Sequence, residues 1–183
     1  MSIIPAEALK NHIGIIGKTG SGKTFAAKGI VEGLLDAGER VCIVDPASAW
    51  WGLKSKTSGK AGAYRVVIFG GDHADLPLGA VHGEAIAEIV ATSNTPAIID
   101  TSLMKVGERT RFFTDFASEL LRKNKGPLHL FIDECHLFCP PGNLRPMPSP
   151  TPVDRLLVVQ PPASLAPKSS PSALRGHWHR LLL

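Results

Sequence analysis

Apolar and polar positions form two alternating kinds of run along the first 139 residues of the chain. Short apolar runs of strand length predict five strands, at 12–17, 40–45, 65–69, 97–100 and 128–132. Between them, apolar residues three or four positions apart predict helices at 23–36, 80–92 and 106–123. Strands that alternate with helices indicate an α/β fold, in which a mostly parallel sheet is covered on both faces.

A glycine-rich segment connects the first predicted strand to the first predicted helix. It reads Gly17-Lys18-Thr19-Gly20-Ser21-Gly22-Lys23-Thr24. This sequence fits G-x-x-x-x-G-K-[ST], the Walker A or P-loop pattern, in which glycines let backbone N–H groups surround phosphate oxygens. The start of the following helix also favours anions. We expect Lys23 to reach the β- and γ-phosphates and the Thr24 hydroxyl to bind Mg²⁺. Phe25 completes the predicted nucleotide-binding segment.

An acidic pair, Asp133-Glu134, follows the last of the five predicted strands. An acidic residue at the carboxyl end of a buried strand can hold the Mg²⁺ that bridges the phosphates, so Asp133 is the Walker B candidate for metal binding. A second carboxylate beside it can activate water, and Glu134 is therefore the candidate general base. The pair favours a hydrolase over a small-molecule kinase. Because the chain has no Asn-Lys-x-Asp motif, ATP with Mg²⁺ is the expected cofactor.

Charge and cysteine content narrow the function classes. Residues 1–139 carry 15 basic and 15 acidic side chains, whereas residues 140–183 carry five and one, so the whole net charge of +4 lies in the tail. The charge of the folded part therefore gives no evidence of nucleic-acid binding. Cys42, Cys135 and Cys139 indicate reduced thiols rather than a zinc site.

Neither a leader sequence nor a membrane-spanning segment is evident in the sequence. No apolar run approaches the roughly 20 residues of a membrane span. The first residues also lack a basic stretch followed by an apolar one. We therefore expect a cytoplasmic protein that does not contact a membrane.

The character of the sequence changes at about residue 140. Ten of the 15 prolines lie in residues 140–183, and no periodic pattern predicts a helix or strand there. We divide the chain into an ATPase domain at 1–139 and a Pro-rich tail at 140–183. The tail is either a disordered basic linker or an out-of-frame translation of the gene. We favour the second interpretation, because a nucleotide-binding sheet that stops after its metal-binding strand lacks its later strands.

Together with the Walker motifs, two further stretches carry a family resemblance. They are Val44-Asp45-Pro46 with Trp50-Trp51-Gly52-Leu53, and Ile68-Phe69-Gly70-Gly71-Asp72-His73. With these residues, positions 5–139 resemble the HerA/FtsK-like ATPases of the RecA-type P-loop class. The chain looks most similar to HerA-like ATP-binding proteins of bacteria, phages and mobile elements.

The resemblance implies a RecA-like three-layer sandwich and a homo-hexameric ring. Such rings hydrolyse ATP to translocate or remodel double-stranded DNA, in some cases with a nuclease partner. By position, Lys23, Thr24, Asp133 and Glu134 carry over. The family also uses a polar sensor on the next strand and an arginine finger. The tail offers neither in a credible context, so we expect a fold that is incomplete at its C-terminus and hydrolyses ATP poorly. We assign no finger among the tail arginines, which are Arg145, Arg155, Arg175 and Arg180.

Two other functions remain open. A superfamily-two helicase fragment is one, because Asp133-Glu134-Cys135-His136 matches a DExH box. No Ser-Ala-Thr motif follows that box, and Asp45-Pro46 after a strand fits the ring ATPases better. A truncated nucleotide-binding fragment without motor activity is the other.

Several residues near the predicted site have two interpretations each. Asp45 and Asp100 end strands and either approach the metal or cap a turn. We interpret His73 and His136 as loop residues rather than catalytic groups. For the pair Trp50-Trp51 we favour packing over stacking on a base.

Overall fold

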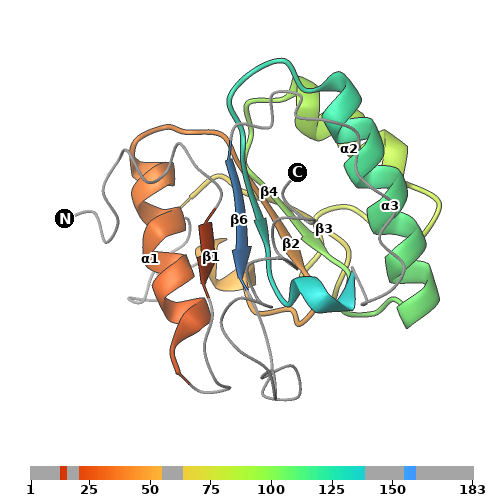
Figure 1. The fold of residues 1–183 in the computed structure, drawn as a ribbon, viewed down its shortest axis with the longest axis horizontal. Helices are drawn as coiled ribbons and strands as arrows, with labels where there is room; N and C mark the ends of the chain where they lie inside the picture. Colours follow the sequence, from red (N-terminus) through yellow and green to blue (C-terminus); the bar gives the residue numbers. More distant parts are fainter. Residues whose placement is uncertain (1–12, 16–20, 55–63, 139–154, 160–183) are drawn as a thin grey trace, which may run out of the picture.

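The structure is a computed structural model of the chain, and it describes residues 13–15, 21–54, 64–138 and 155–159 (Figure 1). In chain order its elements are β1 (Ile13–Ile15), α1 (Lys23–Asp36), β2 (Val41–Asp45), η2 (Trp51–Lys54), β3 (Val67–Phe69), α2 (Gly83–Thr92), β4 (Ala97–Asp100), α3 (Val106–Lys123), β5 (His129–Ile132), η3 (Cys135–Leu137) and β6 (Arg155–Val159). The six strands form one sheet in the order β1-β6-β5-β2-β4-β3, and all pairs are parallel.

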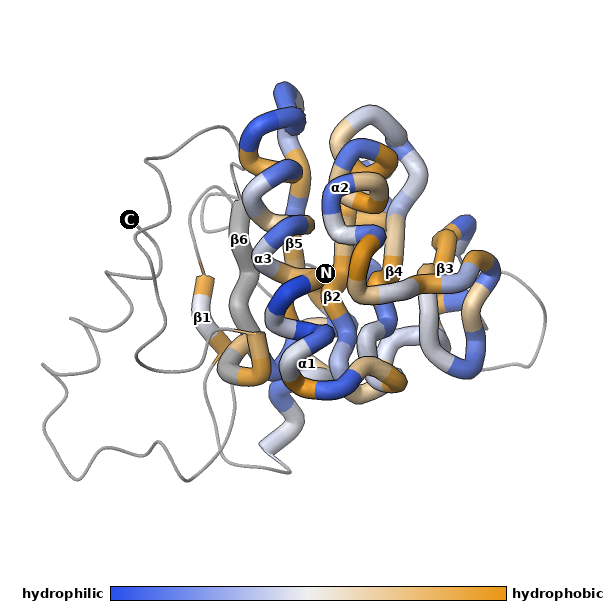
Figure 2. The backbone as a smooth tube through the Cα atoms, turned by 90° about the vertical axis from the view of Figure 1, so that its right-hand side faces the viewer, coloured by the Kyte–Doolittle hydropathy of each residue, from blue (hydrophilic) through white to orange (hydrophobic). Residues whose placement is uncertain are grey.

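The two faces of the sheet are covered by different helices, α1 on one side and α2 with α3 on the other (Figure 1). Side chains alternate along each strand, so Ile43 and Phe131 pack with α1, whereas Val44 and Ile132 pack with α2 and α3. Hydrophobic residues follow one another along β2 and β4 (Figure 2), as expected for strands buried on both faces. The α/β class and the RecA-like layered arrangement that the sequence predicts are confirmed.

The sixth strand was not predicted. The sequence indicated no strand after residue 139, but β6 pairs with β1 on one side and β5 on the other. The apolar run at 156–159 has strand length, and the prolines on either side of it outweighed that signal. The sheet therefore continues past β5, and that expectation was wrong. The domain boundary at residue 139 and the out-of-frame origin of the tail stay predictions.

At the amino ends of the strands, Arg40 joins the carboxyl-terminal ends of the two helices. Its guanidinium donates hydrogen bonds to the carbonyl oxygens of Val90, Ala91, Ser93 and Pro127 and to Oδ1 of Asn124, over 2.7–3.3 Å. The first three of these carbonyls lie at or just beyond the end of α2, where they have no partner within the helix. The side chain thus ties α2 and α3 to the start of β2.

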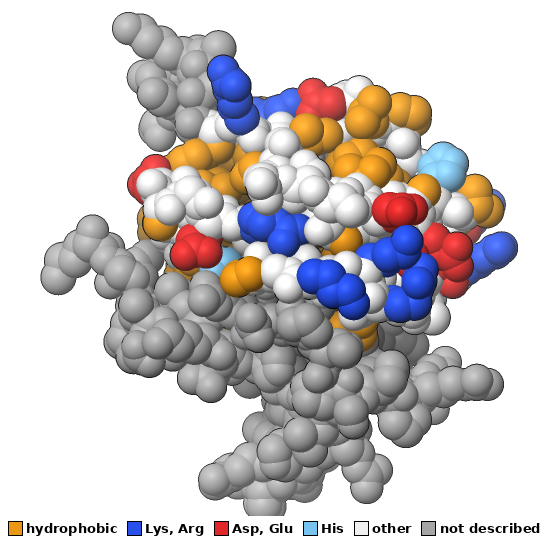
Figure 3. All heavy atoms as spheres, turned by 90° about the horizontal axis from the view of Figure 1, so that it is seen from above, with side chains coloured by type: hydrophobic (Ala, Val, Ile, Leu, Met, Phe, Trp, Pro, Cys, Tyr) orange, Lys and Arg blue, Asp and Glu red, His pale blue; other side chains and the backbone are white. Residues whose placement is uncertain are grey.

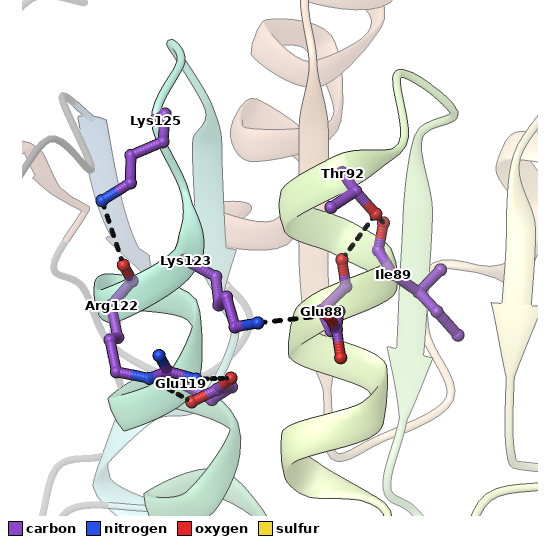
Figure 4. Close-up of polar contacts among 7 residues, drawn as sticks. All are labelled: Glu88, Ile89, Thr92, Glu119, Arg122, Lys123 and Lys125. Atoms are coloured by element: carbon purple, nitrogen blue, oxygen red, sulfur yellow. Dashed lines mark hydrogen bonds and ion pairs between the residues drawn. The ribbon is translucent and has the colours of Figure 1, made fainter.

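Exposed charges on α2 and α3 pair with one another. Lys123 reaches Glu88 at 3.2 Å from one helix to the other, and Arg122 pairs with Glu119 one turn earlier (Figure 4). Seen from above, the described part of the molecule mixes basic and acidic side chains with apolar ones (Figure 3). No face of a single charge is visible in that view.

Candidate nucleotide-binding site

The predicted phosphate-binding segment is partly described. Gly17, Lys18, Thr19 and Gly20 lie outside the described residues. Ser21 and Gly22 lead into α1, and Gly22 has a left-handed backbone with φ +85°. A Cβ at this position would meet no described atom within 4 Å, so the need for glycine here is conformational rather than steric.

The first turn of α1 supplies the next part of the predicted site. Lys23 and Thr24 are its first two residues, and both are half-buried, whereas Phe25 is 83 % exposed. The helix has no acidic residue in its first turn, and among the described residues no side chain caps its N-terminus. The first N–H groups of the helix therefore still attract an anion, because no capping carboxylate offsets their positive potential.

Three buried carboxylates lie side by side where β5, β2 and β4 end. Asp45 is the register partner of Asp100, and the residue before Asp45 pairs with the residue before Asp133. The exposed fractions of Asp45, Asp100 and Asp133 are 0, 3 and 2 %. The predicted Walker B residue thus lies at the carboxyl edge of the sheet in a row of three acids. We predicted Asp133 at this edge, but the row itself was not foreseen.

Asp133 receives a hydrogen bond on each carboxylate oxygen. The indole Nε1–H of Trp50 donates to Oδ2 at 2.9 Å, and the backbone N–H of Glu134 donates to Oδ1 at 3.0 Å. A carboxylate has about four lone-pair positions, so both oxygens retain acceptor capacity. The indole contact had no sequence signal beyond the conspicuous Trp pair.

Glu134, the candidate base, has a left-handed backbone with φ 45° and ψ 45°. This region is unfavourable for residues other than glycine, and a residue held there costs on the order of 1–3 kcal/mol. It directly precedes η3, and its side chain is half-buried.

Asp45 and Asp100 cap turns. Both oxygens of Asp45 accept backbone N–H groups, from Ala47 at 3.0 Å and Trp50 at 2.8 Å. Oδ1 of Asp100 accepts the N–H of Ser102 at 2.8 Å. Of the two interpretations left open by the sequence, the turn cap is the one that the contacts support.

The pKa of Asp45 is raised to about 6, chiefly by burial and to a smaller extent by the neighbouring carboxylates Asp100 and Asp133. The two N–H donors from Trp50 and Ala47 act in the opposite direction. The net direction shows that desolvation dominates at this edge, because a charge removed from water loses more than two hydrogen bonds return.

Gly71 sets the distance between the loop after β3 and the end of β4. It has φ +69°, and a Cβ there would lie 2.2 Å from Oδ2 of Asp100. Only glycine permits both the backbone conformation and the close approach. The Phe69-Gly70-Gly71-Asp72 stretch that supported the resemblance therefore has a structural role beside the acidic row.

The other residues singled out from the sequence have simpler environments. Trp50 is fully buried, as the packing interpretation predicted, whereas Trp51 is 42 % exposed and stacks on the exposed His73 at 4.2 Å. Cys42 and Cys135 are buried thiols, and burial raises the pKa of Cys42 above its usual range. The side chain of His136 and the whole of Cys139 lie outside the described residues.

Within the described ranges, no three His, Cys, Asp or Glu side chains are grouped so that they could hold a metal ion. In the same part of the chain, no helix is both long and apolar enough to cross a bilayer.

The new strand β6 lies directly beside β5, in the place where the resemblance implies a polar sensor. The residue that follows β6 is Gln160, which lies outside the described residues. Of the tail arginines, only Arg155 falls on a described element, and there only its backbone in β6 is described. The arginine finger therefore stays unassigned.

Comparison with known protein families gives a match over most of the chain. Residues 2–122 match the family described as "Helicase HerA, central domain". No curated protein and no solved structure matches the chain. The match covers the glycine-rich segment and α1 but ends before β5, so the acidic pair rests on sequence and geometry alone.

Proposed function

Because the chain belongs to the family of the HerA helicase central domain, an ATP-binding motor family, we propose that it binds ATP with Mg²⁺ and hydrolyses the nucleotide. One observation carries the proposal. β1 and β5 are parallel with one strand between them, so the glycine-rich segment after β1 and the acidic pair after β5 leave the sheet at the same edge. In open α/β sheets, ligands bind at that edge.

Side-chain contacts link the two halves of the proposed site. Lys28, on the second turn of α1, places its Nζ 5.9 Å from the centre of the Trp50 ring. The same indole donates to Asp133. The helix that begins at Lys23 is thus connected to the Walker B carboxylate through one buried side chain.

The proposed ligands suit Mg²⁺. A carboxylate and a hydroxyl are oxygen donors, which this ion prefers, and it is usually held by one or two protein groups plus phosphates and water. A site of that kind needs no group of three protein ligands. We assign Thr24 and Asp133 to the ion, which supplies charge stabilisation on the phosphates when bound.

Each remaining residue has a role that its position permits. Gly17 to Gly22 bind phosphate oxygens through backbone N–H groups, and Lys23 neutralises charge that develops on the transferred phosphoryl group. Glu134 accepts a proton from the attacking water. Phe25, exposed on the first turn of α1, borders the nucleotide.

We extend the proposal to DNA on the strength of the family alone. HerA-type activity implies an assembly in which ATP hydrolysis moves double-stranded DNA, and we propose a hexamer that works with a nuclease partner. Stimulation of ATP turnover by double-stranded DNA and the mass of the assembly in solution test these two points separately.

The main test is a pair of substitutions in the full chain. Lys23→Ala should abolish measurable ATP binding in calorimetry, and Glu134→Gln should preserve binding while lowering turnover at least about 100-fold. Lys125→Ala is the matched control, because Lys125 lies at the opposite end of the sheet and donates to the carbonyl of Arg122. Turnover that survives Lys23→Ala would refute the phosphate-loop assignment, and loss of binding in Glu134→Gln would remove that residue from the role of base.

The alternatives predict different results. The family match favours the ring ATPases over a superfamily-two helicase. A nucleotide-binding fragment without motor activity would bind ATP through Lys23 but show no turnover that Glu134→Gln could lower.

A further inference from the structure

Trp50 is a fully buried aromatic side chain that donates a hydrogen bond to Asp133, the proposed metal-binding carboxylate. Its backbone and its side chain contact different acids: the N–H donates to Asp45 at 2.8 Å, and the indole Nε1–H donates to Asp133 at 2.9 Å. The residue therefore bridges the ends of β2 and β5. Packing alone does not require either contact.

The position of the indole is fixed from several directions. Asp45 holds the turn that carries it, accepting N–H groups from Ala47 and Trp50. Within this turn Ser48 has a left-handed backbone with φ 53°, a conformation that persists only where surrounding contacts hold it. The ring itself lies 6.3 Å from the ring of Phe131 on β5, centre to centre, and beneath Lys28 of α1.

We propose that Trp50 is a positioning residue for Asp133 and that its indole N–H sets the affinity of the site for Mg²⁺. The inference rests on the proposed function, because it assumes that Asp133 helps to hold the ion. A carboxylate rotates easily about its last bond. A donor on Oδ2, together with the Glu134 N–H on Oδ1, leaves Asp133 one orientation in which both bonds are kept.

Hydrogen bonds to a metal-binding carboxylate orient it, and removing such a partner lowers metal affinity or activity about 10- to 100-fold. A phenyl ring at position 50 would remove the donor and keep part of the apolar contacts of the indole. A loss of packing would change the affinity with and without Mg²⁺ alike, whereas the loss of the donor should change the dependence on Mg²⁺. ATP binding that does not involve Mg²⁺ depends on the phosphate loop and should be unaffected.

The test is Trp50→Phe in the full chain, measured by calorimetry with a non-hydrolysable ATP analogue. Affinity for the analogue is determined in EDTA and at increasing concentrations of MgCl₂. We expect the MgCl₂ concentration for half-maximal effect to rise about 10- to 100-fold, with unchanged affinity in EDTA. The matched control is Trp51→Phe, because Trp51 is exposed and stacks on His73 instead of bonding to a carboxylate.

Each outcome is decisive. An unchanged magnesium dependence overturns the inference, and so does an equal loss of affinity with and without Mg²⁺, which would indicate a purely structural role. If the unmodified protein binds no analogue under either condition, the proposed function fails and the inference fails with it. Should Trp50→Phe not fold, replacement of Trp50 by 3-benzothienylalanine keeps the bicyclic shape, removes the donor and is judged by the same criterion.

Discussion

The two ends of the sheet accommodate charged side chains in opposite ways. At the amino ends, one cation, Arg40, donates to five oxygen atoms of the segments around α2 and α3. At the carboxyl ends, three carboxylates lie in a row and receive N–H groups from the backbone and one indole. None of the ion pairs found among the described residues involves these three acids.

The difference separates stability from function. The guanidinium N–H groups of Arg40 all have acceptor oxygens within the protein, so this side chain needs no further partner. The acidic row concentrates negative charge in a poorly solvated place, which raises the free energy of the folded state unless a proton or a cation offsets it. Asp45 and Asp100 offset part of this cost by capping turns, whereas Asp133 is the acid of the row that we propose to bind the ion.

The largest effect is expected from removing the cation at the amino end. Arg40→Ala leaves the carbonyls around the ends of α2 and α3 without their donor, and we expect a loss of about 3 kcal/mol in the free energy of unfolding. Urea unfolding followed by circular dichroism measures it, with the exposed Arg65→Ala as control. ATP affinity of the folded fraction should be unchanged. A loss of nucleotide binding without a loss of stability would show that the amino end contributes to function, contrary to the role in stability that we assign to it.

The sequence predicted those elements well in which the spacing of apolar residues agrees with the turn residues at the ends. The helices 23–36 and 106–123 match α1 and α3, and the strand 97–100 matches β4. In each case the apolar spacing agrees with the length of the element, and a turn residue follows it. The α/β class follows from this alternation alone.

Other features could not be predicted, because they depend on contacts between distant residues. The indole of Trp50 meets Asp133 across 83 positions of the chain, and no local pattern reports such a pairing. β6 was missed because prolines nearby dominate local propensity, whereas its position depends on pairing with β1 and β5. The roles of Lys23, Thr24, Asp133 and Glu134 came from motifs and stay predictions until they are tested.

The pH dependence of stability tests the acidic end. Asp45 has a folded-state pKa of about 6 against an ordinary value of 3.8. Between these values the folded chain binds a proton that the unfolded chain has released, so the free energy of unfolding falls as the pH rises from about 4 to about 6. Asp45→Asn should remove about 2 kcal/mol of that decline, because one pKa unit corresponds to about 1.4 kcal/mol and relaxation reduces the full value.

Urea midpoints measured at intervals across this pH range check the prediction. Carboxylates with lowered pKa values, such as Asp75, contribute a slope of the opposite sign and cancel in the comparison of the two proteins. Asp72→Asn, on an exposed loop, is the control. An equal decline in the unmodified protein and in Asp45→Asn would show that the buried row is not where the charge penalty lies.

The smallest effect is expected for the exposed ion pair at the amino end. Lys123 and Glu88 join α3 to α2 at 3.2 Å, but their side chains are 34 and 58 % exposed (Figure 4). Water and salt screen such a pair, and a double-mutant cycle of Lys123→Gln and Glu88→Gln should give a coupling of at most about 0.5 kcal/mol, smaller still in high salt. A coupling above about 1.5 kcal/mol would mean that exposed charges also hold the two helices together. Exposed ion pairs would then stabilise the amino end as much as the hydrogen bonds of Arg40 do. The difference in burial could no longer explain why the two ends of the sheet behave differently.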